Sequence, residues 1–190
     1  MAGWKSINDM LSAINKEDYL VLRNYNNILK ILGTDDDIDI LCKDMHKLVN
    51  RLGAVCISDK EPCYNYYVVV DDKKLLLDIR TVGDGYYDSK WERRMLEEKV
   101  PCNDFFILDK ENYRYSFLYH VLVQKHESMA GKYKGQIEDL FGINIENKER
   151  CCKLLIKYLR DQGYQCTKPL DQGVYINDST LHYISSQIDL

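Results

Sequence analysis

The feature that most constrains this chain is a run of aspartates that passes directly into an alternating apolar segment, Thr34-Asp35-Asp36-Asp37-Ile38-Asp39-Ile40-Leu41-Cys42. Successive side chains of an extended segment point to opposite faces, so Asp37 and Asp39 share one face while Ile38 and Ile40 share the other. Two neighbouring carboxylates cost free energy unless a cation or a raised pKa relieves their repulsion. The segment therefore predicts a strand with one core face and one face suited to a divalent metal.

A third carboxylate interrupts another apolar alternation further along the chain. In Leu75–Arg80, the leucines 75 and 77 share a face with Ile79, whereas Asp78 and Arg80 share the opposite face. Asp is depleted from strand interiors, so a carboxylate at position 78 needs a physical reason. About forty residues separate it from the first aspartates, which is enough for a helix and returning strands that place the two acidic strands side by side.

Asp37, Asp39 and Asp78 are therefore the predicted catalytic and metal-binding residues. Their carboxylate oxygens are the ligands that Mg²⁺ and Mn²⁺ prefer. Such ions neutralise phosphate oxygens, and one carboxylate can activate an attacking hydroxyl, which together permit phosphoryl or nucleotidyl transfer. Arg80 shares a face with Asp78 and is expected to contact a phosphate of the substrate or to hold a carboxylate in place.

Parts of the acidic run also fit a structural role or a different metal. Asp-rich turns precede many strands, so Asp35 and Asp36 are expected to be turn residues, and a purely structural role for the remaining aspartates is an alternative. An EF-hand calcium loop fits poorly, because the required Gly and terminal Glu do not follow at the right positions.

The remaining segments alternate between strand and helix patterns, which predicts an α/β fold of the α+β kind with a mixed sheet flanked by helices. Residues 1–110 form the expected core, and residues 111–190 form a mainly helical C-terminal portion packed on that core within one folding unit. Strands are expected at 19–23, 37–42, 54–57, 66–70, 75–80, 105–108 and 173–176, and helices at 5–17, 45–52, 91–99, 112–125, 136–141 and 148–161.

The composition limits which binding partners and which cellular compartment are expected for this protein. A formal net charge of −4 gives no general attraction for polyanions, so nucleic acid is not an expected partner. The chain has no apolar run of membrane-spanning length and no apolar signal segment at its start, which predicts a cytoplasmic protein without a membrane span. Seven cysteines without a CxxC pair are expected to be reduced thiols in small core positions.

The order of these elements resembles the nucleotidyltransferase superfamily, the fold of DNA polymerase beta and the minimal nucleotidyltransferases, over roughly residues 1–110. The run Asp35–Ile40 is also similar to the acidic motif of the choline-phosphotransferase and fukutin-related branch, whose members decorate cell-surface glycans with phosphate-linked alcohols. The resemblance implies that Asp37 and Asp39 are the metal-binding pair and that Asp78 is the third carboxylate.

One departure from the superfamily concerns the nucleotide phosphates. Members usually carry a Gly-Ser pair at the start of a helix about ten residues before the acidic pair, where backbone N–H groups receive the phosphates. Here the place after the first strand reads Leu22-Arg23-Asn24-Tyr25, and Gly33-Thr34 lies too close to Asp37 to open an intervening helix. Arg23 and Asn24 are the expected substrate contacts instead, with an ordinary role at a strand end as the alternative.

The expected function is that of a metal-dependent nucleotidyl- or phospho-alcohol transferase in cell-surface polysaccharide biosynthesis. Its expected partner is a nucleotide or a nucleotide-activated small molecule, and the sequence does not indicate the acceptor. Two alternatives are a non-catalytic nucleotide- or glycan-binding module on the same fold and a toxin-like nucleotidyltransferase.

Several further side chains carry weaker signals. His120 and His126 are six residues apart, which does not match the four-residue spacing that places two ligands on one helix face, so core or solvated roles are favoured. Two clusters fit either a rim around a site or a solvated helix face: Trp91 with Arg93 and Arg94, and Lys125 with Lys132 and Lys134.

Overall fold

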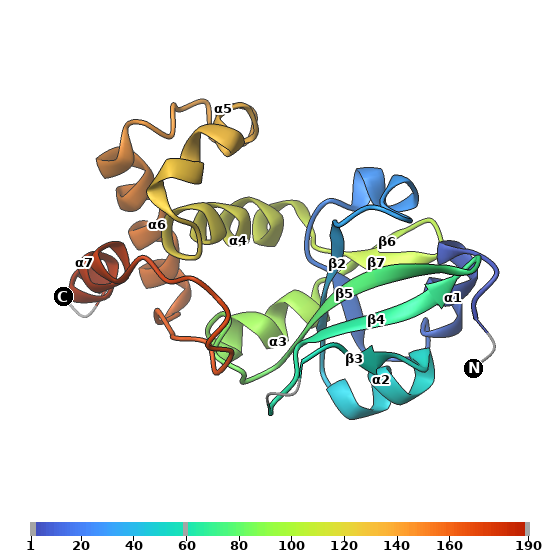
Figure 1. Ribbon diagram of the computed structural model, residues 1–190. Coiled ribbons are helices and arrows are strands. Elements are labelled where there is room, and N and C mark those ends of the chain that lie inside the picture. The colour runs from blue at the N-terminus through green and yellow to red at the C-terminus, as the bar shows by residue number, and fades with distance from the viewer. Residues whose placement is uncertain (1–2, 59–60, 189–190) are drawn as a thin grey trace. The chain divides into compact units, whose positions relative to one another are not determined.

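The computed structural model describes residues 3–58 and 61–188, which form two compact units (Figure 1). The first unit comprises the chain up to Asp84 together with Glu92–Asp109, and the second comprises Gly85–Trp91 together with the chain from Lys110 onward. The first unit contains the sheet and the second contains the C-terminal helices. Among the described residues, no helix is both long enough and apolar enough to cross a membrane.

Within the described residues, seven strands form one mixed sheet in the order β3-β4-β5-β2-β1-β7-β6. The pairs β2·β5 and β1·β7 are parallel, and the other neighbours are antiparallel. The mixed sheet, together with the concentration of helices toward the C-terminus, confirms the expected α/β class. The strands are β1 (Tyr19–Val21), β2 (Asp37–Cys42), β3 (Val55–Cys56), β4 (Asn65–Val70), β5 (Lys73–Thr81), β6 (Val100–Cys102) and β7 (Phe105–Ile107).

The two acidic strands lie side by side, as their patterns predict. In the parallel pair β2·β5, Asp39 is in register with Asp78, and Ile40 is in register with Ile79. Because alternation runs in phase on both strands, the isoleucines contribute to one face of the sheet and the aspartates to the other.

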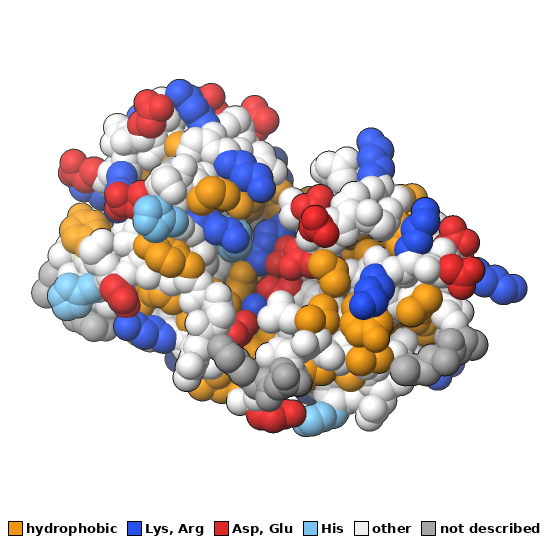
Figure 2. All heavy atoms as spheres, in the orientation of Figure 1, with side chains coloured by type: hydrophobic (Ala, Val, Ile, Leu, Met, Phe, Trp, Pro, Cys, Tyr) orange, Lys and Arg blue, Asp and Glu red, His pale blue; other side chains and the backbone are white. Residues whose placement is uncertain are grey.

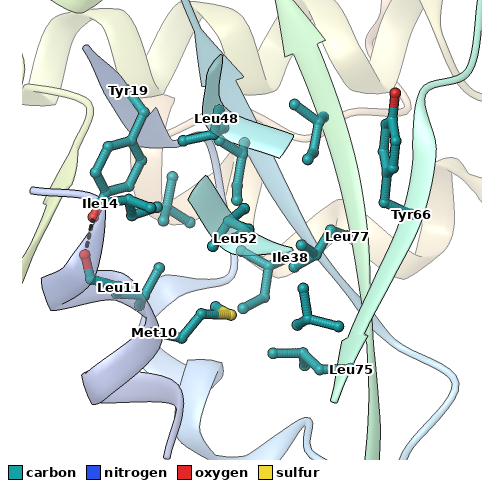
Figure 3. Packing of buried hydrophobic residues seen from close by; sticks show 14 of the residues in the cluster. Met10, Leu11, Ile14, Tyr19, Ile38, Leu48, Leu52, Tyr66, Leu75 and Leu77 are labelled. Atoms are coloured by element: carbon teal, nitrogen blue, oxygen red, sulfur yellow. Dashed lines mark hydrogen bonds between the residues drawn. The ribbon is translucent and has the colours of Figure 1, made fainter. Parts of the chain in front are cut away.

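Helices α1 (Ile7–Ala13) and α2 (Met45–Leu52) supply the residues that bury the apolar face, as Figure 3 shows. The Ser6 side chain accepts a hydrogen bond from the backbone of Asp9 and caps α1, and Asp44 caps α2 in the same way. Met10 and Leu11 from α1 pack with Ile38 of β2, each nearly or completely buried. Full burial of such a side chain contributes about 1.5–3 kcal/mol, so this cluster is a main source of the stability of the first unit.

The second unit is built from helices around an aromatic cluster. Trp91 is fully buried, stacks on Tyr164 with ring centroids 5.4 Å apart, and donates its Nε1–H to Oδ1 of Asn112 at 2.9 Å. Trp91 is therefore a core residue of this unit, and its assignment to an exposed rim is wrong. The helices that complete the unit are α4 (Lys110–Val123), η2 (Glu127–Tyr133), α5 (Lys134–Phe141), α6 (Lys148–Gln162) and α7 (Asp178–Ile188).

The predicted strand at 173–176 is wrong. The Asp171 side chain accepts a hydrogen bond from Gly173 N at 2.8 Å, which turns the chain locally, and residues 173–176 pair with no strand of the described sheet. Asn177 then caps α7, because its Oδ1 accepts a hydrogen bond from Thr180 N at 3.1 Å. A run of four residues is too short to specify a strand when a capping residue follows directly.

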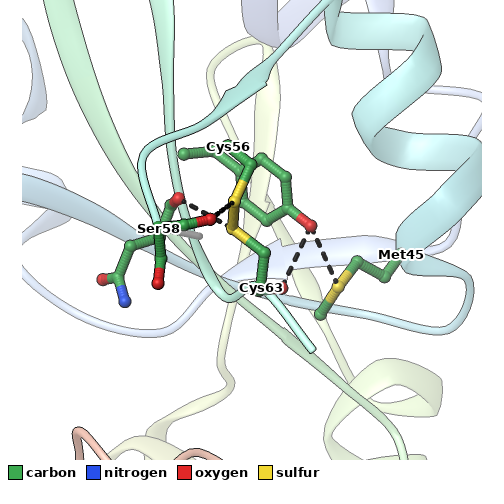
Figure 4. Close-up of a disulfide and its surroundings, with 6 residues drawn as sticks. Met45, Cys56, Ser58 and Cys63 are labelled. Atoms are coloured by element: carbon green, nitrogen blue, oxygen red, sulfur yellow. Dashed lines mark hydrogen bonds between the residues drawn. A yellow bond between two sulfur atoms is a disulfide. The ribbon is translucent and has the colours of Figure 1, made fainter. Parts of the chain in front are cut away.

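The expectation of seven reduced thiols is wrong for one pair of cysteines. A disulfide joins Cys56 at the end of β3 to Cys63 just before β4, with the Cα atoms 6.3 Å apart (Figure 4). Cys42 and Cys151 fit the expected core role, since burial raises the pKa of their thiols to about 12 and about 11 respectively. The cysteines outside the disulfide are Cys42, Cys102, Cys151, Cys152 and Cys166.

Candidate functional site

The sheet register brings three polar residues into one row across neighbouring strands of the first unit. Asp39 on β2 is the partner of Asp78 on β5, and Asp78 is in turn the antiparallel partner of Asn65 on β4. Neighbouring strands lie about 4.8 Å apart, so their paired side chains on one face are neighbours. This polar row, Asn65-Asp78-Asp39, is the centre of the candidate site.

Asp39 is held by a buried ion pair with Arg23. The Arg23 Nη2 atom lies 2.5 Å from Asp39 Oδ1, and both side chains are at least nine-tenths buried. The backbone positions this pair, because Leu22 N donates to Asp39 O at 2.9 Å and extends the β1·β2 pairing to the residue before Arg23. A charge-assisted contact of this kind compensates for removing both groups from water.

Asp78 is held by Arg80, two residues further along the same strand. The Arg80 Nη2 atom lies 2.8 Å from Oδ2 and 2.7 Å from Oδ1 of Asp78, and Arg80 is 3% exposed. Only the contact with Oδ2 has the geometry of a hydrogen bond, so the buried Oδ1 accepts none within the described structure. The Arg80 guanidinium also lies over the ring of Tyr64, with its carbon 4.9 Å from the ring centroid.

The surroundings of Asp78 favour its protonated form. Burial raises the pKa of Asp78 to about 6, the charges of Arg80 and Arg23 oppose this rise, and the like charge of Asp39 adds to it. Burial is the largest of these effects, so the charged form of Asp78 is disfavoured although an arginine lies beside it. A proton or a cation at Asp78 would offset the cost of burying its charge.

Asp37 lies two residues before Asp39, at the start of β2, where it is half-buried and in register with Leu76. Alternation places it on the same face as Asp39. Asp35 and Asp36 are exposed and precede the strand, as expected for turn residues. Within residues 3–58 and 61–188, no three His, Cys, Asp or Glu side chains gather closely enough to hold a metal as they stand.

The donor set nevertheless suits a hard divalent cation. Every candidate ligand is a carboxylate, which matches the preference of Mg²⁺ and Mn²⁺ for oxygen. The buried Oδ1 of Asp78 accepts no hydrogen bond from the described residues, so it is available to a cation, and burial raises the pKa of this carboxyl. Asp39 and Asp78 would hold such an ion together, with Asp37 as the third ligand from the same face.

Asn24 takes a different position from the other predicted substrate contacts. It is exposed, adopts a left-handed backbone conformation with φ of 60°, and begins the short helix η1 (Tyr25–Lys30) without capping it through its side chain. The structure pairs Arg23 with Asp39 and Arg80 with Asp78, so both arginines join the charged site, while Asn24 lies three residues beyond β1. The left-handed conformation of Asn24 lets the chain turn directly after Arg23.

Asn65 is a member of the polar row that sequence reasoning missed. Asn is typical of turns and lies directly before the apolar run Tyr66–Val70, so its residue type alone predicts a turn. The useful signal is alternation, because counting back by two from Tyr67 places Asn65 on the half-exposed face of β4. Its carboxamide, which can donate and accept, extends the polar row beyond Asp78.

A cavity of about 630 Å³ lies at the carboxyl ends of β2 and β5. Cys42, Thr81 and the first turn of α2 line it, whereas none of Asp37, Asp39 and Asp78 does. Cys42 and Thr81 belong to the face of the sheet opposite the aspartates. The candidate site is therefore defined by its charged groups, and the cavity is a separate feature of the first unit.

The weaker candidates in the second unit have local structural partners. His120 is buried and its Nδ1 lies 3.1 Å from Gln124 Oε1, while His126 accepts a hydrogen bond from Ser128 N at the start of η2. Lys134 pairs with Glu146 at 3.3 Å. On the face drawn in Figure 2, acidic and basic side chains are interspersed, without a large patch of one sign among the residues shown.

Comparisons with known proteins assign neither a family nor a function to this chain. No protein-family model matches the sequence, and no curated protein matches it. A search of solved structures finds the chain titled "Crystal structure of JHP933 from Helicobacter pylori", with 13% identity and a TM-score of 0.42 over 95% of this chain and 86% of that chain. A likeness of that size carries no argument about fold or function.

Proposed function

We propose that this protein is a metal-dependent nucleotidyl- or phospho-alcohol transferase whose site is built on β2 and β5. The observation that carries the proposal is the register of Asp39 with Asp78, a buried and a largely buried carboxylate that lie side by side and are each paired with a buried arginine. A purely structural site gains little from such a pair, because desolvating like charges opposes folding.

Each charged residue of the site has a distinct role in the proposed reaction. Asp37, Asp39 and Asp78 would hold Mg²⁺ or Mn²⁺, and such an ion would supply charge neutralisation for the phosphate oxygens. Arg23 and Arg80 compensate the carboxylates before substrate binds, and their planar guanidinium groups suit the oxygens of a phosphate once a cation satisfies the carboxylates. Asp78 completes the metal site or acts as the base that accepts the proton of an attacking hydroxyl.

The substrate class follows from the resemblance of the acidic motif. A nucleotide or a nucleotide-activated small molecule provides the phosphate, and a cell-surface glycan precursor is the preferred acceptor. Asn24 and Asn65, which are both exposed and adjoin the charged residues in sequence or in register, are the proposed contacts for polar groups of the substrate.

Isothermal titration calorimetry with Mn²⁺, followed by a panel of nucleotides, tests this function. The wild-type protein is expected to bind Mn²⁺ and at least one nucleotide, and Asp39→Asn and Asp78→Asn are expected to lose metal binding while retaining the fold by circular dichroism. Asp36→Asn is the matched control, because it removes an exposed carboxylate of the same acidic run. Absence of metal and nucleotide binding by the wild type would refute the proposal.

A non-catalytic binding module is the second candidate. It is favoured by the segment after β1, where Asn24 and the short helix η1 take the place of a Gly-Ser pair that opens a phosphate-binding helix. A binding module retains affinity for metal and nucleotide but forms no product. Mass spectrometry of nucleotide incubated with protein, Mn²⁺ and candidate acceptors separates the two candidates.

A further inference from the structure

The Cys56–Cys63 disulfide lies at one end of a chain of contacts that reaches the carboxylates. Cys63 immediately precedes Tyr64, whose backbone O accepts a hydrogen bond from Ile79 N at 2.9 Å. This bond extends the β4·β5 ladder to the residue that precedes the start of β4. The disulfide therefore fixes the chain at the position where Tyr64 enters the sheet.

Tyr64 connects this backbone anchor to the charged site. Its ring is buried, and the Arg80 guanidinium lies over it at 4.9 Å while contacting both carboxylate oxygens of Asp78. A cation–π contact at a desolvated site depends on where the ring is held. The position of Tyr64 thus influences how Arg80 holds Asp78.

The anchor is weak without the disulfide. β3 has two residues, and among the described residues near this end its pairing continues with the bond from Ile57 N to Asn65 O at 2.9 Å. The Tyr66 hydroxyl adds a bond to Cys63 O at 3.0 Å, drawn in Figure 4. A two-residue edge strand contributes few ladder bonds, so the covalent link is the strongest constraint on this segment.

We propose that the Cys56–Cys63 disulfide is a redox switch that sets the position of Tyr64 and, through Arg80, the geometry of the Asp39/Asp78 site. A dithiol reductant supplies two electrons and two protons, so the S–S bond breaks, two thiols form, and the reductant closes its own disulfide. Attack occurs at Cys56, which is half-buried, whereas Cys63 is 6% exposed and leaves as the thiolate. The effect of the switch on metal affinity rests on the proposed function, but its effect on Tyr64 and Arg80 does not.

Thiol counting and hydrogen exchange on the full chain provide the first test. The oxidised protein is expected to show five thiols after denaturation without reductant and two more after reduction. Reduction is expected to accelerate exchange of the Ile79 amide about tenfold, because its acceptor is no longer anchored. Seven thiols in protein purified without reductant, or equal exchange at Ile79 in both states, would overturn the switch.

Variants separate the switch from a general loss of stability. The double variant Cys56→Ser/Cys63→Ser is expected to show the Ile79 exchange of the reduced wild type, with or without reductant. The control Cys102→Ser removes a thiol of the same unit that is outside the disulfide, and its Ile79 exchange is expected to respond to reductant as in the wild type. In Tyr64→Leu the disulfide still forms, but its reduction is expected to leave the affinity of the site for Mn²⁺ unchanged. Tyr64→Phe keeps the aromatic ring, so its Mn²⁺ affinity is expected to respond to reduction as in the wild type. If Tyr64→Leu responds like the wild type, the path through the ring is wrong.

Mn²⁺ titration in both redox states links the switch to the site. Reduction is expected to weaken Mn²⁺ binding about tenfold, the scale at which residues that orient a ligand affect metal affinity. An unchanged affinity would overturn control of the site, whereas no Mn²⁺ binding in either state would refute the proposed function and leave the exchange at Ile79 as the measure of the switch.

Discussion

At the scale of single residues, the titration of Asp78 makes the stability of the first unit depend on pH. Its pKa is raised from 3.8 to about 6 in the folded state, so the folded protein binds a proton more tightly than the unfolded chain between these values. The stability contributed by this group is fully present below pH 3.8 and is lost as pH rises through 6. The free energy of unfolding is therefore expected to fall by about 2 kcal/mol as the pH is raised from about 4.5 to about 7.5.

The variant Asp78→Asn is expected to lack this dependence. Relative to wild type, its free energy of unfolding in urea with EDTA is expected to improve by about 2 kcal/mol as the pH is raised from about 4.5 to about 7.5. Asp36→Asn, which changes an exposed residue outside the strand, is expected to follow the wild-type curve. A difference between Asp78→Asn and wild type that is constant across this range would contradict the raised pKa.

Arg23 and Asp39 are expected to behave as a coupled pair. Because both side chains are at least nine-tenths buried, Arg23→Met leaves a desolvated carboxylate and is expected to cost about 3 kcal/mol near neutral pH without metal. The double variant Arg23→Met/Asp39→Asn is expected to recover most of that loss. A double-mutant cycle by urea unfolding measures the coupling, and additive losses would show that the pair contributes little.

At the scale of elements, the alternation of apolar residues is the reliable signal. It located β2 and β5 and predicted their adjacency, because Asp39 and Asp78 each interrupt an otherwise apolar strand. It failed at β6, where Pro101 occupies the middle of a three-residue edge strand, and at α7, whose start depends on the cap at Asn177. Short elements depend on strand partners that are distant in sequence or on caps outside the element, and the period of apolar residues indicates neither.

The candidate site shows the same limit. The aspartates were found because a charge in an apolar strand is conspicuous, whereas Asn65 enters the site through its register with Asp78. The disulfide likewise depends on the β3·β4 pairing, which places Cys56 opposite Tyr66 and near Cys63. Register is a long-range property, so its consequences are visible only in the folded chain.

The pairing of β2 with β5 can be tested through the core beneath it. Ile40 is fully buried in register with Ile79, so Ile40→Ala is expected to destabilise the protein by about 3 kcal/mol in urea unfolding. Val69→Ala on β4 is the control. Because Val69 is 36% exposed, this substitution is expected to destabilise the protein by less than about 1 kcal/mol. Equal losses would contradict the assignment of the apolar face.

At the scale of the whole molecule, the boundary between the two units passes through helix α3 (Ser89–Glu97). Trp91 belongs to the second unit and Glu92 to the first, although they are consecutive residues. Glu92 is fully buried and its Oε2 accepts a hydrogen bond from Gly83 N at 2.7 Å. One helix thus supplies a core aromatic residue to one unit and a buried carboxylate to the other, which no composition shift in the sequence indicates.

This division predicts that Trp91→Ala acts mainly on the second unit. Trp91 stacks on Tyr164 and donates to Asn112, so its truncation is expected to cost about 3–5 kcal/mol in that unit. Hydrogen exchange read by mass spectrometry should show faster exchange in α4 and α6 at a concentration of urea where β2 and β5 remain protected. Tyr183→Ala, which removes a 41% exposed ring from α7, should leave both sets of peptides close to wild type. If β2 and β5 lose protection together with α4 and α6, the two units unfold as one, and the cooperativity of the molecule extends across the boundary in α3.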